Sequence, residues 1–304
     1  EGDLTIMWPD GQVSRETVQA NQHLTLQQSE ATEKTGGAAP SPEGFWQAAA
    51  NTGIDFTHQE NDDFIDFKRE PLLPHEFSHW GPAMAKSDIN GDGREDIWIG
   101  GAKDQAGAVY LQQVDGRFLA TTQPALQADA NHEDADGTWL DANGDGTLDL
   151  YVASGGSEWP AQSAAYQDRL YMNDGQGRLT KATNALPELT ASAGTVVALD
   201  GDQDGDMDLF VGNRVTPGAY PQTPQSYWLN NEGGTFTLAN DRLPDEGYVG
   251  MVNDALAADL DRDGQSELLV VGEWMAVEQW AVTDEGWQRQ EESFAGPNQG
   301  WWFS

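Results

Sequence analysis

The sequence predicts an all-β protein made of repeated four-stranded units, of the kind that form the blades of a β-propeller. Three observations support this fold class: an acidic loop pattern occurs four times, short apolar runs flank each loop, and turn residues punctuate each unit. Antiparallel strands joined by tight turns produce this combination. The repeat is considered first because it determines the whole architecture.

The four acidic loops share the pattern D-x-[DN]-x-D-G-x-x-[DE]. Their first aspartates lie 53, 59 and 59 residues apart. Propeller blades repeat about every 40–50 residues, so this period suits a four-stranded blade with long loops. The loops occupy residues 88–96, 141–149, 200–208 and 259–267.

Apolar runs of strand length lie on both sides of the loops. Thr195–Leu199 precedes the third loop, Leu209–Val211 follows it, and Leu268–Val271 follows the fourth. Their β-branched and aromatic residues favour strands. A third strand is expected in each unit, at residues 108–111, 169–172, 226–229 and 277–280. Hairpins to a fourth strand are indicated by the turn residues at 114–117, 173–175, 231–234 and 283–286.

The N-terminal part has a different organisation. Leu4–Trp8, a turn at Pro9–Gly11 and a second alternating stretch at His23–Leu26 predict a small β unit over residues 1–28. Residues 29–44 have the composition of a linker. The propeller units are expected over residues 45–304.

The two ends of the sequence suggest that the chain is part of a larger protein. Gly300–Ser304 resembles a strand that enters a fifth unit, so we expect the ring to be incomplete within this chain. The chain begins inside an apparent strand, which suggests a piece of a larger protein whose other domains are its neighbours.

Calcium explains the loop pattern. It prefers six to eight oxygen ligands, which positions 1, 3, 5 and 9 supply from side chains and position 7 from its backbone carbonyl, while Gly at position 6 permits the sharp turn. We therefore expect about four Ca²⁺ ions, one in each loop. The predicted ligands are Asp88, Asn90, Asp92, Arg94, Asp96, Asp141, Asn143, Asp145, Thr147, Asp149, Asp200, Asp202, Asp204, Asp206, Asp208, Asp259, Asp261, Asp263, Gln265 and Glu267. Acidic Asp-Gly turns without metal are the alternative.

An EF-hand is disfavoured because it needs a bidentate Glu at position 12 and flanking helices. Position 12 is apolar in all four loops and lies in strand-like runs. Coordination should therefore close at position 9, and calcium should act as a structural ion. The residues at position 12 are Ile99, Val152, Val211 and Val270.

Composition limits the partners. The 304 residues hold 51 acids and 15 bases, a net charge of −36, which disfavours nucleic acid and anionic membranes. A solvated acidic surface, as in marine or salt-exposed proteins, explains most of this charge. Cysteine is absent, so disulfides and thiolate chemistry are excluded. No apolar run is long enough for membrane insertion.

One enzyme motif requires attention. His75-Glu76-Phe-Ser-His79 matches the H-E-x-x-H pattern of zinc proteases, which requires a helix that places both histidines on one face. Pro71 and Pro74 precede the motif and Gly81-Pro82 follows it, which leaves too little room for that helix. The sequence therefore assigns no catalytic residues.

Two long loops between strands are candidate ligand-binding sites. Residues 154–167 carry Trp159 and Tyr166, and residues 213–225 carry Arg214 and Tyr220. Such side chains stack on sugars or anchor proteins when they are exposed. Packing between blades is the competing interpretation.

The four loops at blade spacing resemble the FG-GAP/VCBS repeats, relatives of the integrin alpha-chain propeller. Leu4–Gly11 and Ala20–Leu26 look like the end of an ASPIC/UnbV-type domain, which accompanies such repeats in large secreted bacterial proteins. Glu267 departs from the Asp usual at that position. The resemblance implies a calcium-stabilised propeller that is secreted or lies at a bacterial cell surface, with association with the outer membrane as one form of that location.

The expected function is adhesion or recognition of an extracellular protein or carbohydrate. The alternatives are a polysaccharide-active enzyme of lyase or dehydratase type and a passive spacer of a large surface protein.

Overall fold

The structure is a computed structural model that describes residues 2–7, 12–19, 26–27, 33–34, 51–60, 63–290 and 299–302. The chain divides into two compact units, Glu1–Ala50 and Asn51–Ser304. No described helix has the length and apolar character needed to cross a membrane.

The first unit is a small antiparallel sheet. Strand β1 (Gly2–Met7) pairs with β2 (Gln12–Val18), and β3 (Glu33–Lys34) pairs with the start of β2. Strand β3 therefore lies inside the stretch whose composition indicates a linker. The predicted turn at residues 9–11 and most of the predicted strand at 23–26 lie outside the described residues.

The described residues of the second unit form four antiparallel sheets, numbered here in chain order. Each has four consecutive strands, joined first to second, second to third and third to fourth. Sheet 1 comprises β4 (Met84–Ser87), β5 (Asp96–Ile99), β6 (Ala108–Gln112) and β7 (Phe118–Ala120). Sheet 2 comprises β8 (Asp134–Leu140), β9 (Asp149–Ser154), β10 (Arg169–Asn173) and β11 (Leu179–Lys181). Sheet 3 comprises β12 (Ser192–Leu199), β13 (Asp208–Val215), β14 (Tyr227–Glu232) and β15 (Thr235–Leu238). Sheet 4 comprises β16 (Met251–Ala258), β17 (Glu267–Ala276), β18 (Glu278–Thr283) and β19 (Gly286–Arg289).

Helical segments are short and lie between strands. They are α1 (Asp66–Arg69), α2 (Pro124–Ala128), η2 (Ala164–Tyr166), η3 (Asn240–Arg242) and η4 (Pro244–Gly247). The fold is therefore all-β, as predicted, and the predicted third strands and hairpin turns are confirmed. The described residues form no closed ring.

The C-terminal strand differs from the prediction. Strand β20 (Gln299–Trp301) pairs with the end of β17 and so extends sheet 4, whereas the sequence suggested a strand of a fifth unit. The physical reason is the length of β17, whose last residues, Glu273–Ala276, extend beyond its pairing with β18 and offer free backbone groups.

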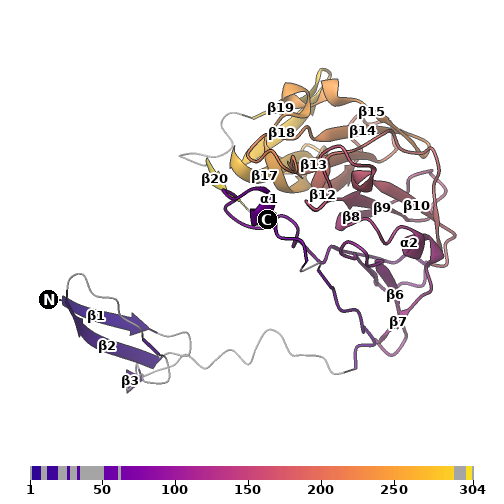
Figure 1. Cartoon of the computed structure of the whole chain (residues 1–304). Coiled ribbons are helices and arrows are strands. Elements are labelled where there is room, and N and C mark those ends of the chain that lie inside the picture. The colour runs from indigo at the N-terminus through magenta and orange to yellow at the C-terminus, as the bar shows by residue number, and fades with distance from the viewer. Residues whose placement is uncertain are drawn as a thin grey trace. The chain divides into compact units, whose positions relative to one another are not determined.

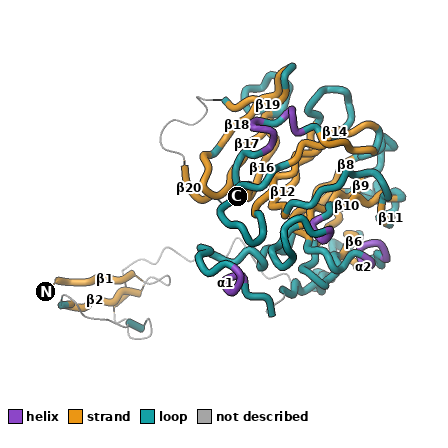
Figure 2. The backbone as a smooth tube through the Cα atoms, turned by 45° about the horizontal axis from the view of Figure 1, so that its top comes forward, coloured by secondary structure: helices purple, strands orange, loops and turns teal. Residues whose placement is uncertain are grey.

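The sheets follow one another through their first strands. Strand β8 contacts β4 and β12, and β12 contacts β16. Figures 1 and 2 show the sheets in chain order from β6 to β19. The acidic loops join first to second strands, so all four lie at one end of the sheets. The connections between second and third strands lie at the opposite end.

The hydrophobic core is divided among the gaps between neighbouring sheets. In β9, Leu150 and Val152 face the cluster shared with sheet 1, whereas Tyr151 and Ala153 face the cluster shared with sheet 3. Successive side chains of a strand point to opposite faces, so a sheet buried on both sides needs apolar residues at every position. This explains why the strands after the loops are continuous apolar runs.

Candidate cation loops and the opposite end of the sheets

The four acidic loops connect β4 to β5, β8 to β9, β12 to β13 and β16 to β17. In each loop the ninth residue is the first residue of the second strand and is buried. Its carboxylate accepts a hydrogen bond of 2.8–3.3 Å from the backbone N–H of the loop's second residue. In the first three loops the other oxygen accepts from a backbone N–H of the third strand, at 2.8–2.9 Å. These ninth residues are Asp96, Asp149, Asp208 and Glu267.

Burial changes the acidity of these groups. It raises the pKa of Asp96, and it raises the pKa of Asp149 and Asp208 to about 6. The longer side chain of Glu267 still forms the bond to the second residue of its loop, Leu260. Replacement of Asp by Glu at this position therefore preserves the loop's closure.

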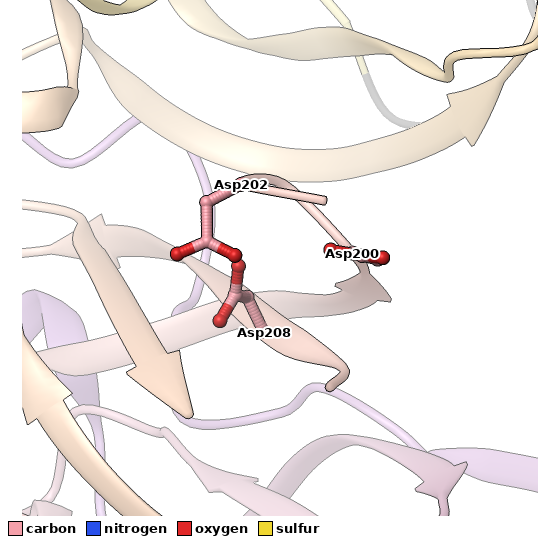
Figure 3. A group of neighbouring side chains, drawn as sticks. All are labelled: Asp200, Asp202 and Asp208. Atoms are coloured by element: carbon pink, nitrogen blue, oxygen red, sulfur yellow. The ribbon is translucent and has the colours of Figure 1, made fainter. Parts of the chain in front are cut away.

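The third and fourth loops each gather three carboxylates. In the third loop, one oxygen each of Asp200, Asp202 and Asp208 lies within 4.8 Å of the others. Figure 3 shows Asp202 and Asp208 directing their carboxylates at each other, with Asp200 beside them. Asp259, Asp261 and Asp263 form the equivalent group in the fourth loop.

The hydrogen bonds of Asp200 show whether the third loop suits a cation. Asp200 Oδ1 is buried and has no hydrogen-bond partner, although Asp200 Oδ2 accepts from Gly205 N at 3.2 Å. A buried carboxylate oxygen without a partner is costly unless a cation or donor meets it. The oxygen-only donor set is one that a hard divalent cation prefers. These acidic groups could therefore hold a metal ion.

The first two loops have Asn at position 3 and are held by their own backbone. Asp88 accepts from Asp92 N at 3.1 Å and from Gly93 N at 2.8 Å, and the bond from Gly93 is the largest cause of the lowered pKa of Asp88. Asp141 accepts the same two bonds in the second loop. At position 7, the Arg94 guanidinium bonds to Asp92.

Hydrogen bonds from the next sheet hold the loops in place. Asn231 Nδ2 of sheet 3 donates to Ala142 O at 2.9 Å, in the second loop. Asn173 Nδ2 of sheet 2 donates to Ile89 O at 2.7 Å, in the first loop. The third loop has no such bond from sheet 4 among the described residues; Arg242 in η3, which follows sheet 3, instead has its Nη2 3.4 Å from the equivalent carbonyl oxygen, Gly201 O. The loops are therefore part of the contact between successive sheets.

At the opposite end, residues 63–83 cross sheets 2, 3 and 4. Asp66 Oδ1 accepts from Ser157 Oγ at 2.5 Å, after β9. Glu70 accepts from Gly218 N at 2.9 Å and from Tyr220 N at 2.8 Å, after β13. This segment reaches sheet 4 through His75, so one piece of chain connects three sheets.

Glu273 is the centre of a hydrogen-bonded group at this end. Its side chain is fully buried and receives bonds from His75 Nε2 at 2.7 Å and from Tyr220 OH at 3.2 Å. Trp274 Nε1 donates to Tyr220 OH at 2.7 Å. Arg214 Nη2 lies 4.0 Å from Glu273 Oε1.

Trp274 has an unusual conformation. Its backbone φ is +58°, in the left-handed region that bulky residues rarely adopt, yet its side chain is 62% exposed. Strain of this kind costs about 1–3 kcal/mol and is concentrated at functional sites. The bond to Tyr220 fixes the orientation of this exposed indole.

The four predicted ligand-loop residues have different environments. Arg214 and Tyr220 meet at Glu273, but Arg214 is buried, with its guanidinium 3.6 Å from the centre of the Trp80 ring. Tyr166 is buried and donates to Trp159 O at 2.8 Å. Burial leaves Arg214 and Tyr166 as supports of this end of the sheets and not as exposed groups.

Sequence reasoning missed Glu273 and Trp274. The signal was available, because a charged residue followed by Trp interrupts the apolar run after the fourth loop. Buried carboxylates are rare without partners, so such an interruption indicates a polar network.

Residues 75–79 form bends and irregular backbone, without the helix that a zinc-protease motif needs. His75 bonds to Glu273, whereas His79 Nδ1 lies 3.1 Å from Glu76. The two imidazoles therefore contact different carboxylates, that of Glu273 and that of Glu76.

Comparison with known proteins supports the repeat. The sequence pattern of FG-GAP-like repeats matches residues 88–152 and 141–211. No curated protein matches the chain in sequence.

Several solved structures are similar. A lectin of Agrocybe aegerita that recognises non-reducing terminal N-acetylglucosamine is 19% identical, with a TM-score of 0.48 over 71% of this chain and 53% of its own. The V. cholerae biofilm matrix protein Bap1 is 18% identical, with a TM-score of 0.30 over 68% of this chain and 30% of its own. A rhamnogalacturonan lyase of Bacillus licheniformis is 11% identical, with a TM-score of 0.31 over 70% of this chain and 52% of its own. The chain spans about half the length of the first structure. Residues 88–211 therefore carry two FG-GAP-like repeats.

Proposed function

We propose that this chain is an extracellular ligand-recognition module of β-propeller type. Ca²⁺ ions, one in each acidic loop, fix the sheets at one end, and the opposite end presents the binding surface. We further propose that residues 1–28 are the end of an ASPIC/UnbV-type domain and that the module belongs to a secreted or surface protein.

The observation that carries the recognition role is Trp274. A fold with no ligand to bind has little reason to keep an exposed Trp on a left-handed backbone, because Gly would remove both the strain and the exposed apolar surface. The Tyr220 hydroxyl orients the indole, which lowers the entropy lost when a ligand stacks on it.

Carbohydrate or protein is the ligand class that suits this surface. An indole face provides a large, flat, polarisable contact, and Tyr and Trp are enriched where proteins bind partners. The charge of −36 opposes polyanions at long range, which favours neutral or basic ligands.

Calcium has a structural role in this proposal. The ninth carboxylate of each loop is already committed to backbone donors, and Asn173 and Asn231 connect the loops to the next sheets. An ion would complete the charge balance of these loops and stabilise the contacts between sheets.

The recognition role is tested on immobilised neutral glycans and extracellular proteins. Binding should be lost in Trp274→Ala and retained in Leu119→Ala, a matched control that is 60% exposed on the outermost strand of sheet 1. Equal binding by both variants would place recognition elsewhere. Cleavage of a bound polysaccharide would favour the enzyme alternative, and absence of any ligand would favour a spacer.

A further inference from the structure

Unpartnered buried carboxylate oxygens occur in two places in the described part of the chain. One is Asp200 in the third acidic loop, discussed above. The other is a group of three glutamates, defined here as the glutamate cluster: Glu60, Glu133 and Glu158. Four of its oxygens are buried without a hydrogen-bond partner, namely Glu60 Oε2, both oxygens of Glu133 and Glu158 Oε1.

The glutamate cluster lies at the opposite end of sheet 2 from the acidic loop. Glu133 immediately precedes β8, and Glu158 follows β9, so the two strands of one hairpin bring them together. Glu60 comes from the segment before sheet 1. The cluster therefore joins a peripheral segment to the second sheet.

Gly156 shows how closely the two inner carboxylates approach. A Cβ at this position would lie 2.4 Å from Glu133 Oε2 and 2.7 Å from Glu158 Oε2. Gly156 also has a φ of +82°, which favours glycine. Only a residue without a side chain leaves both carboxylates in this space. The three glutamates are less tightly gathered than the aspartates of the third and fourth loops.

Glu133 is the central member of the cluster. It is 3% exposed, and neither of its carboxylate oxygens meets a donor. Burial first, and then repulsion from Glu158 and Glu60, raises its pKa well above the ordinary value. An isolated buried carboxylate is unfavourable, so a counter-charge or a proton has to be present.

Basic groups surround the cluster, but none among the described residues donates a hydrogen bond to Glu133. His58 Nε2 lies 2.7 Å from Glu60 Oε1 at the rim of the cluster, and Arg69 Nη1 donates to Ser157 O, next to Glu158. The Lys103 ammonium lies over the Trp159 ring, 5.3 Å from its centre, and 2.5 Å from Asp104. Arg214 donates to Asn253 and lies near Glu273.

We propose that the glutamate cluster binds a divalent cation through Glu133 and Glu158, with Glu60 at its rim. Its donors are carboxylate oxygens only, which suits Ca²⁺ better than a metal that prefers nitrogen or sulfur. This site is separate from the four acidic loops and lies at the other end of the sheets. The ion would join residues 51–60 to sheet 2, where the loop ions cannot reach.

The test counts bound Ca²⁺ by equilibrium dialysis of chelator-stripped, folded protein. Glu133→Gln should bind about one equivalent less than wild type. Asp261→Asn, in the fourth acidic loop, is the matched control and should independently lose about one equivalent, so that the double variant loses about two. Loss in Glu133→Gln alone would support this site while contradicting the loop site.

An unchanged number of bound Ca²⁺ ions in folded Glu133→Gln would overturn the proposal. The alternative would then be that Glu133 and Glu158 share a proton. Near-ultraviolet circular dichroism establishes that the variant is folded. If Glu133→Gln does not fold, Glu158→Gln and Glu60→Gln test the site instead. Loss of one Ca²⁺ equivalent in Glu158→Gln and weaker Ca²⁺ affinity in Glu60→Gln would support the site. Wild-type Ca²⁺ binding in both variants would refute it.

Discussion

His75 and Glu273 lie 198 residues apart in the sequence and are joined by a 2.7 Å hydrogen bond between Nε2 and Oε1. The Glu273 side chain is fully buried, while His75 is 28% exposed. The bond joins the segment that crosses three sheets to β17, the second strand of sheet 4. It also raises the pKa of His75, which burial and Arg214 oppose.

This bond predicts a pH-dependent contribution to stability. A histidine whose pKa is raised by folding stabilises the native state fully below its ordinary value of 6.5, and the contribution is lost as the pH rises through the higher folded value. His75→Gln keeps a donor but cannot become charged. We expect it to lose roughly 1 kcal/mol at acidic pH and progressively less above neutrality.

Urea unfolding of wild type and His75→Gln across this pH range measures the effect. His79→Gln is the matched control, because its imidazole faces the partly exposed Glu76. A difference between wild type and His75→Gln that stays constant with pH would contradict the assignment.

The hydrogen bonds of Asn231 predict how much one side chain between neighbouring sheets contributes to the free energy of unfolding. Its amide donates to Ala142 O and Met207 O, and its oxygen accepts from Gly234 N. Asn231→Ala leaves the buried Ala142 carbonyl and two partly buried backbone groups without this partner, which should cost roughly 2–3 kcal/mol.

The measurement is the urea midpoint at saturating Ca²⁺. Asn230→Ala is the control, since the adjacent side chain makes no hydrogen bond within the described residues, and it should change stability by less than about 0.5 kcal/mol. Equal effects of the two substitutions would show that the contact with the second loop adds nothing.

The strands and loops could be predicted because the burial of both sheet faces leaves a clear mark. Every residue of β9 and of β13 is buried, and each strand holds a short apolar run, Leu150–Ala153 in β9 and Leu209–Val211 in β13, that contrasts with the acidic loop before it. The turn residues then fix the hairpins. This local information sufficed for the order of strands within each sheet.

The path of residues 63–83 could not be predicted in the same way. Its contacts with Ser157, Tyr220 and Glu273 join residues 91, 150 and 198 positions apart. Such pairs depend on how whole sheets pack, and no local pattern encodes them. The sequence shows the interruption of the apolar run at Glu273 and Trp274, but the left-handed backbone and the exposure of Trp274 are visible only in the folded chain.

Asp200 predicts opposite effects in the presence and absence of calcium. Its Oδ1 is buried without a partner, so the Asp200 carboxylate destabilises the metal-free protein. In the calcium-loaded protein the same oxygen would bind the ion. Asp200→Asn should therefore be as stable as wild type or more stable in EDTA, and less stable in Ca²⁺. A site filled at 100 times its Kd contributes about 2.7 kcal/mol.

Thermal melts of both proteins with EDTA and with Ca²⁺ give the comparison. The Tm of wild type should fall on chelation, and that of Asp200→Asn should fall less. An unchanged wild-type melting curve in EDTA would remove the structural role of the ion.

Asp168 predicts a second pH dependence of stability. A salt-bridged acid usually stabilises a protein as the pH rises, whereas Asp168 should destabilise it. It accepts from Tyr151 OH at 2.7 Å and from Ser154 N at 2.7 Å, and burial raises its pKa from 3.8 to about 7 against the opposing charge of Arg169. The native state then holds a proton that the unfolded chain releases. This contribution to stability is complete below about pH 4 and is lost as the pH rises toward 7.

Asp168→Asn keeps an oxygen for Ser154 N and places an N–H against the Tyr151 hydroxyl, without a titrating group. Relative to wild type it should gain about 2–4 kcal/mol between pH 4 and pH 7. Urea unfolding at several pH values measures this gain, and Asp284→Asn, at an exposed hairpin position, should show none. Parallel curves for wild type and Asp168→Asn would mean that Asp168 stays ionised in the folded protein, because Arg169 then compensates its burial.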